Sequence, residues 1–177
     1  LSNCPSLISL DCSNNSLNSF SPLNLSSCTS LTSLDCSNNS LSSLDLSNCP
    51  ALISLDCSYN SLNGFNPLNL SSCISLTSLD CSNNSLSSLD LSSCTALTSL
   101  YCSGIDSLDL SDCTSLTYLD CSGIGSGSLD LSNCTSLTYL DCSNRYSSSR
   151  HLTSLDVSNC TALTYLDCSY NDLTSLN

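Results

Sequence analysis

Apolar and polar residues alternate in short segments that recur along the whole chain. The tripeptide Leu-Asp-Cys, with Leu-Tyr-Cys as its variant, begins at Leu10, Leu34, Leu55, Leu79, Leu100, Leu119, Leu140 and Leu166. A second tripeptide, Leu-Asp-Leu or a close variant, lies between successive copies, as at Leu44. Alternation with a period of two is typical of a strand that buries one face. The pattern predicts two short strands in every repeat.

The repeats also predict the architecture. Successive copies of the first tripeptide are 19 to 26 residues apart, and Ser, Asn and Gly fill the segments between them, as expected for turns. No segment keeps its apolar residues at the spacing of an amphipathic helix. We therefore expect an all-β solenoid of about eight coils, with two short parallel strands per coil and a single domain over residues 1–177.

One coil carries the motif of a known family. Leu31, Leu34, Cys36 and Asn39 match the pattern L-x-x-L-x-L-x-x-N, so the chain resembles the leucine-rich repeat family. A second half-unit, L-x-x-L-D-L at residues 41–46, completes a coil similar to the short nested 21-residue repeats of bacterial and protist proteins. The resemblance implies a leucine-rich-repeat-like solenoid, and a role in recognition, adhesion or scaffolding.

Cysteine is where the chain departs from the family pattern. Its 16 cysteines fall into two sets, one at the strand tripeptides and one at the turns, where Cys49 and its equivalents occupy the family's second asparagine position. Two buried columns of small thiols fit this spacing, and so do disulfides within each coil. Zinc is disfavoured because no C-x-x-C pair occurs. Gly104 and Gly123 interrupt the first asparagine position, and we expect those two coils to turn differently.

The end coils resemble internal ones, although the end of an isolated solenoid exposes apolar surface. The chain starts at Leu1 rather than Met, so we expect a processed chain or a piece of a longer array. Further repeats, flanking domains, or a second copy stacked end to end into a fibre would cover the ends.

The charge balance excludes two classes of partner. Fifteen acidic residues against two basic ones give a net charge of −13, which repels phosphate and disfavours nucleic acids and anionic membranes. No apolar run reaches the roughly 20 residues of a membrane span, so we expect no membrane insertion. Asp106, Asp109 and Asp112 crowd one half-unit and suggest a calcium site. The alternative is a solvated acidic face that is hydrogen-bonded to serine, with no cofactor.

Two further groups of residues are candidate sites. Asn-x-Ser/Thr sequons occur about as often as chance predicts, and the candidates for glycosylation are Asn14, Asn24, Asn38, Asn69 and Asn83. The insertion 144–151 holds a candidate contact loop made of Arg145, Tyr146, Arg150 and His151. His151, the only histidine, has no partner residues in a catalytic pattern, so we expect no enzyme.

Three functions remain, none of them enzymatic. The first hypothesis is an extracellular or cell-surface structural or adhesive repeat protein that could stack end to end into a filament. The second is a recognition module that binds a protein or glycan through a strand face or the insertion loops. Four tyrosines in the C-terminal half, Tyr101, Tyr118, Tyr139 and Tyr165, favour the second. Ice binding on Ser and Thr arrays ranks third, because the aspartate columns would hold hydrated charge there.

Overall fold

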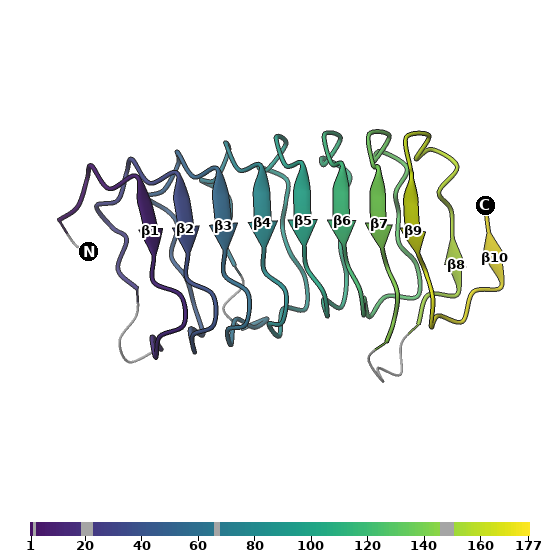
Figure 1. Cartoon of the computed structure of the whole chain (residues 1–177), viewed down its shortest axis with the longest axis horizontal. Helices are drawn as coiled ribbons and strands as arrows, with labels where there is room; N and C mark the ends of the chain where they lie inside the picture. Colours follow the sequence, from purple (N-terminus) through teal and green to yellow (C-terminus); the bar gives the residue numbers. More distant parts are fainter. Residues whose placement is uncertain (2, 19–22, 66–67, 146–150) are drawn as a thin grey trace.

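The structure is a stack of coils with one continuous parallel sheet along its length (Figure 1). This computed structural model describes all residues except 2, 19–22, 66–67 and 146–150. The sheet contains, in this order, β1 (Ser9–Asp11), β2 (Ser33–Asp35), β3 (Ser54–Asp56), β4 (Ser78–Asp80), β5 (Ser99–Tyr101), β6 (Tyr118–Asp120), β7 (Tyr139–Asp141) and β9 (Tyr165–Asp167). Neighbouring strands pair in parallel without a register shift. The expected all-β, leucine-rich-repeat-like solenoid is confirmed, with about seven turns.

Each strand follows the predicted alternation. Its central leucine is buried from β2 to β7, and the residues on either side are half-buried and face outward. Because the strands pair in register, equivalent leucines such as Leu79 and Leu100 lie side by side from coil to coil. The chain thereby builds one long leucine core instead of separate clusters.

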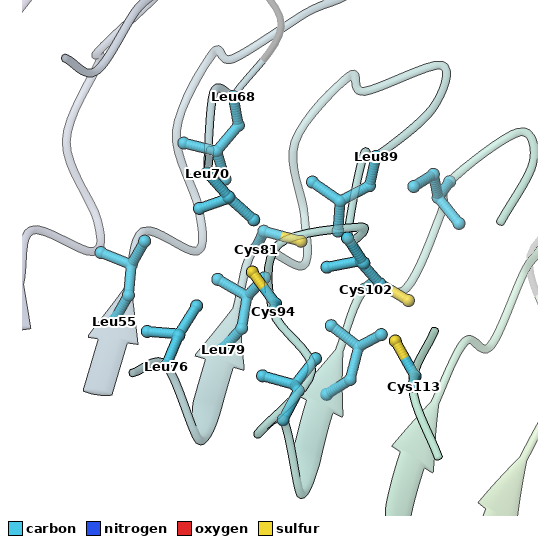
Figure 2. Close-up of a cluster of buried hydrophobic side chains, with 14 of the residues drawn as sticks. Leu55, Leu68, Leu70, Leu76, Leu79, Cys81, Leu89, Cys94, Cys102 and Cys113 are labelled. Carbon is cyan, nitrogen blue, oxygen red and sulfur yellow. The ribbon is translucent and has the colours of Figure 1, made fainter. Parts of the chain in front are cut away.

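Both sets of cysteines enter that core as free thiols. Thirteen of the sixteen are buried, and Cys4, Cys12 and Cys168 are half-buried. Figure 2 shows Cys81 and Cys102 from the strand ends, with Cys94 and Cys113 from the turns, among the leucines of neighbouring coils. The sequence left buried thiols and disulfides as alternatives, and the structure has the thiols.

The thiols should therefore be protected from reagents in the folded protein. A soluble alkylating or disulfide reagent at pH 8 should modify at most Cys4, Cys12 and Cys168 rapidly, and all sixteen thiols after unfolding without reductant. Mass spectrometry gives both counts. Cys168→Ala is the control and should lower the native count and the unfolded count by one each, from at most three to two and from sixteen to fifteen. Rapid labelling of all sixteen in the native protein would contradict the buried columns.

Asparagine side chains join the coils on one edge of the core. Asn60 Nδ2 donates to the Cys36 carbonyl of the preceding coil and to the Cys57 carbonyl of its own, at 3.0 and 3.1 Å, while its Oδ1 accepts the Leu41 N–H at 2.9 Å. The residue before it, Tyr59, has a φ of 50°, a left-handed conformation that asparagine or glycine adopts more easily. Asn39, Asn84 and Asn171 make the same set of contacts.

Two coils form this turn without asparagine, as expected from their glycines. Gly104 and Gly123 take the left-handed position, with φ of 82° and 72°. Ile105 and Ile124 follow them and are buried where asparagine would be, and their N–H groups donate to the carbonyls of Cys102 and Cys121. An apolar contact and a backbone hydrogen bond thus replace the asparagine bridge.

The second wall is less regular than predicted. Among the described residues, its only paired strands are β8 (Ser154–Leu155) and β10 (Ser175–Leu176), with single bridges from Asn18 to Ser40 and from Asn63 to Ser85. The coils differ in length in this half, because the sequence has extra residues near Phe20 and Phe65. The expected strand of the first wall is thus present in every coil, whereas in the described part of the second wall the expected strand pairs only at β8 and β10.

No part of the described chain forms a helix that is long and apolar enough to cross a membrane.

Candidate functional site

The outer face of the eight-stranded sheet carries two columns of side chains. The first and third residues of each strand face outward, because the leucine between them enters the core. From β1 to β5 the first residue is serine, whereas in β6, β7 and β9 it is tyrosine. The third residue is aspartate in every strand of this sheet except β5, which ends on Tyr101. The C-terminal half of this face therefore differs chemically from the N-terminal half.

Four tyrosines stack into a tyrosine ladder, formed by Tyr101, Tyr118, Tyr139 and Tyr165. The ring centroids of Tyr118 and Tyr139 are 4.2 Å apart with planes 5° from parallel, and those of Tyr139 and Tyr165 are 4.4 Å apart at 3°. Tyr101 lies 4.7 Å from Tyr118 at 35°, because it comes from the third strand position and reaches across. Sheet register produces the stack, since the three other tyrosines are paired residues.

The ladder is a neutral, partly desolvated surface. Burial raises the pKa of Tyr118, and hydrogen bonding to the hydroxyls of Tyr139 and Tyr101 raises it further. Burial also raises the pKa of Tyr139. These phenols keep their protons at neutral pH. Tyr165, at the end of the ladder, remains 46% exposed and can contact a ligand with the least rearrangement.

The neighbouring aspartates are fixed by serines two residues further along the chain. Oδ1 of Asp120, Asp141 and Asp167 accepts the backbone N–H of that serine at 2.9 to 3.0 Å. In Asp167 the serine side chain and N–H, with a smaller contribution from Arg145, lower the carboxyl pKa. Asp80 differs: burial raises its pKa, and the residue opposite it is Tyr101. The acidic face that is hydrogen-bonded to serine, expected as the alternative to calcium, is present.

Arg145 brings the opposite charge to this face. Its Nη2 lies 2.8 Å from Oδ2 of Asp167, and its guanidinium carbon is 6.0 Å from the ring centre of Tyr170. A hollow of about 370 Å³ beside it is lined by Ser122, Asp141, Ser143, Arg145 and Tyr165. The ladder, the carboxylates and one guanidinium thus meet at the C-terminal end of the sheet face.

The other members of the predicted contact loop are placed only in part. Tyr146 and Arg150 lie outside the described residues. His151 is half-buried, and its Nδ1 lies 3.6 Å from Oδ2 of the exposed Asp172. The structure thus places Arg145 on the sheet face and His151 beside a different aspartate.

The candidate calcium ligands do not converge. Asp109 and Asp112 line a groove together with Asp90, whereas Asp106 is not part of its lining. Among the described residues, no group of three or more acidic, histidine or cysteine side chains is placed to hold a metal ion. The calcium hypothesis therefore gains no support from the geometry.

The five candidate glycosylation sites are all at the surface: Asn14, Asn24, Asn38, Asn69 and Asn83 are exposed. Asn14, Asn38 and Asn83 share the left-handed turn position, with φ between 51° and 54°. Glycosylation itself stays a prediction.

Sequence reasoning missed the pairing of Arg145 with Asp167 and the position of Tyr170. The two charges are 22 residues apart, so one coil separates them in sequence. The signal was their phase: both follow a strand leucine closely in adjacent coils of the first wall.

Comparison with known proteins places the chain in a family. A leucine-rich repeat profile of two copies matches residues 5–48 and 74–112, and a single-repeat profile matches 51–73. This chain belongs to the leucine-rich repeat family. A search of curated proteins gives no match.

Solved leucine-rich repeat structures resemble the whole chain. The functional domain of InlJ from Listeria monocytogenes, described as including a cysteine ladder, is 36% identical over 98% of this chain and 37% of its own, with a TM-score of 0.85. YopM from Yersinia enterocolitica is 28% identical over 97% of this chain and 37% of its own, at 0.75. The ectodomain of the Arabidopsis thaliana receptor kinase GASSHO1/SCHENGEN3, in complex with CASPARIAN STRIP INTEGRITY FACTOR 2, shares the fold with a TM-score of 0.70. It is 24% identical over 97% of this chain and 24% of its own. The chain spans between 24% and 37% of the length of these proteins.

Proposed function

We propose that this leucine-rich repeat chain is a non-enzymatic recognition module that works outside the cell and binds its ligand on the C-terminal half of the sheet face. The tyrosine ladder carries the proposal. Aromatic side chains dominate the energetics of recognition surfaces, and here four of them interrupt an otherwise repetitive serine and aspartate surface. The Arabidopsis structure, a receptor ectodomain in complex with another factor, supports an extracellular recognition role by analogy of fold only.

Replacing ladder residues with serine should weaken recognition without unfolding the protein. Serine is the residue that β1 to β5 already have at the position of Tyr139 and Tyr165. The protein would be applied to arrays of synthetic peptides and of oligosaccharides, and the affinity of the strongest binder measured by calorimetry. Tyr139→Ser and Tyr165→Ser should each weaken binding about tenfold, as loss of a buried aromatic contact does.

Tyr59→Asn is the matched control. Tyr59 is 55% exposed and lies outside the ladder, and asparagine is the residue found at its turn position in other coils. This variant should bind as the unmodified protein does. If Tyr59→Asn weakens binding as much as the ladder variants, or if the ladder variants bind normally, the sheet face is not the recognition surface.

Assembly into a structural or adhesive filament is a second candidate. The first and last coils leave apolar core residues partly open, as in Leu7, Leu10, Leu166 and Leu173, and Leu176 is 52% exposed. A second copy stacked on either end would bury them. Sedimentation of the same samples distinguishes the two roles, because stacking gives particles whose mass grows with concentration and recognition does not. Ice binding stays a prediction from the sequence.

A further inference from the structure

The carboxylates beside the tyrosine ladder have unused acceptor atoms. We call the side chains of Asp120, Asp141 and Asp167 the acidic lane, since they occupy the same position in β6, β7 and β9. Serine N–H groups bind Oδ1 in each case. Oδ2 of Asp120 and of Asp141 accepts no hydrogen bond from the described residues, whereas Oδ2 of Asp167 binds Arg145. The lane therefore has two acceptors oriented by their serines and available to a donor.

Arg145 shows which chemistry the lane accepts. It reaches the third carboxylate from the turn after β7, and its side chain is 65% exposed while that of Asp167 is 14% exposed. The guanidinium lies against a carboxylate on one side and the ring of Tyr170 on another. Arginine is the side chain that pairs with carboxylates and aromatic rings in this way. An arginine or lysine of a ligand would find a serine-oriented carboxylate at Asp120 and at Asp141, beside the ring edges and hydroxyls of the ladder.

The stacking of the tyrosines disfavours a sugar as the ligand. Sugar rings and aromatic side chains contact each other face to face, but the faces of Tyr118 and Tyr139 are covered by their neighbours at 4.2 to 4.7 Å. The ladder offers ring edges and hydroxyl oxygens instead. Hydroxyl oxygens can accept hydrogen bonds, so the tyrosine and aspartate columns form two adjacent rows of acceptors.

We propose that the acidic lane and the tyrosine ladder dock an extended, basic polypeptide segment, and that Arg145 is an internal competitor that occupies the last carboxylate. This inference deepens the proposed function and rests on it. The charge is complementary, since the protein carries a net charge of −13 and would attract a basic segment from a distance. The four neighbouring strands β5, β6, β7 and β9 span about 14 Å, the length of about four extended residues.

The test uses two synthetic nonapeptides at 50 mM salt. One alternates arginine with serine, and the other has citrulline, which is uncharged and nearly the same shape, in place of arginine. Calorimetry should show binding of the arginine peptide only, and binding should weaken at least tenfold at 500 mM salt because exposed charges are screened. Equal binding of both peptides, no binding of either, or indifference to salt would overturn the proposal.

Two variants should change arginine-peptide binding in opposite directions, and a third is the control. Asp141→Asn should weaken arginine-peptide binding about fivefold, and Arg145→Gln should strengthen it about threefold by releasing Asp167, in keeping with the size of exposed ion pairs. Asp130→Asn, on the opposite wall, should change nothing. Weaker binding by Arg145→Gln would mean that Arg145 contacts the ligand, and the competitor role would be wrong.

A neutral oligosaccharide separates this inference from the proposed function. If a hexamer of N-acetylglucosamine binds, and binding is lost in both Tyr165→Ser and Arg145→Gln, the sheet face is a recognition surface but its ligand is a glycan. If a ligand from the arrays binds unchanged in all ladder and lane variants, both the inference and the proposed function fail.

Discussion

Raising the pH above 9 should unfold this protein over a narrow range. Burial raises the pKa of Cys81 and of Cys142 to about 12, and it raises the pKa of Cys36 at another strand end further still. Cys57, Cys102 and Cys121 also have strongly raised pKa values, for the same reason. In the unfolded chain these thiols return to an ordinary pKa of 9.0.

The free energy of unfolding falls with rising pH because the unfolded thiols lose their protons before the folded ones. Below pH 9 both states keep their thiols protonated, so stability is fully present there. Between pH 9 and the raised folded values, only the unfolded thiols ionise, and the free energy of unfolding falls. Each strongly shifted thiol contributes a loss of up to about 1.4 kcal/mol per pH unit. Because the unfolded thiols are only half ionised at pH 9, each loses about 1 kcal/mol between pH 9 and 10. Six such thiols together remove about 6 kcal/mol, comparable with the roughly 5 to 15 kcal/mol that holds a typical domain folded.

Guanidinium chloride titrations at pH 7, 9 and 10, in reductant and followed by circular dichroism, measure this loss. Changing Cys57 and Cys102 to alanine should lower stability at pH 7, because each leaves a small cavity, yet make the remaining stability less sensitive to pH. An unfolding free energy that stays constant from pH 7 to pH 10 would show that the folded thiols ionise as readily as the unfolded ones.

The sequence was sufficient for the fold because one physical pattern is repeated. Period-two alternation at Leu34 and at every equivalent leucine can be satisfied only if successive strands stack and bury the same column. The burial of cysteine followed from its phase with leucine, as at Cys36. The choice between thiols and disulfides could not be made, because it depends on the directions of neighbouring side chains.

Features that depend on contacts between coils were not predictable. The sequence placed Tyr118, Tyr139 and Tyr165 in one half of the chain, but their parallel stacking required the strand register. It placed Arg145 in an insertion, and although the 22-residue spacing to Asp167 matches one coil, the pairing itself required the strand register. The weak second wall also escaped prediction, since its tripeptides look as regular as those of the first. The local sequence pattern determines which side chains are buried, whereas the candidate site depends on which exposed side chains of adjacent coils come into contact.

Asn60→Ala should cost about 3 kcal/mol, the second largest loss that we expect. Its amide is half-buried and bridges two coils. Alanine would leave the buried Leu41 N–H without its partner. The Cys36 and Cys57 carbonyls would each lose one amide donor and keep a second, from Asn39 and Asn84. Each buried polar group left unsatisfied costs about 1 to 3 kcal/mol, and water reaches this edge only in part. Thermal and denaturant unfolding of the two proteins at pH 7 gives the difference.

Asn15→Ala tests whether the loss of stability in Asn60→Ala comes from the hydrogen bonds between coils or from asparagine at this turn position. Asn15 occupies the same position in the first coil, but its Nδ2 donates only to the carbonyls of Cys12 and Ser13 within that coil, and the residue is exposed. Solvent can replace those hydrogen bonds, so this variant should lose less than about 1 kcal/mol. Equal losses at Asn15 and Asn60 would assign the effect to the turn within a coil. A larger loss at Asn60 assigns it to the hydrogen bonds between coils, which hold the sheet face and its tyrosine ladder in register.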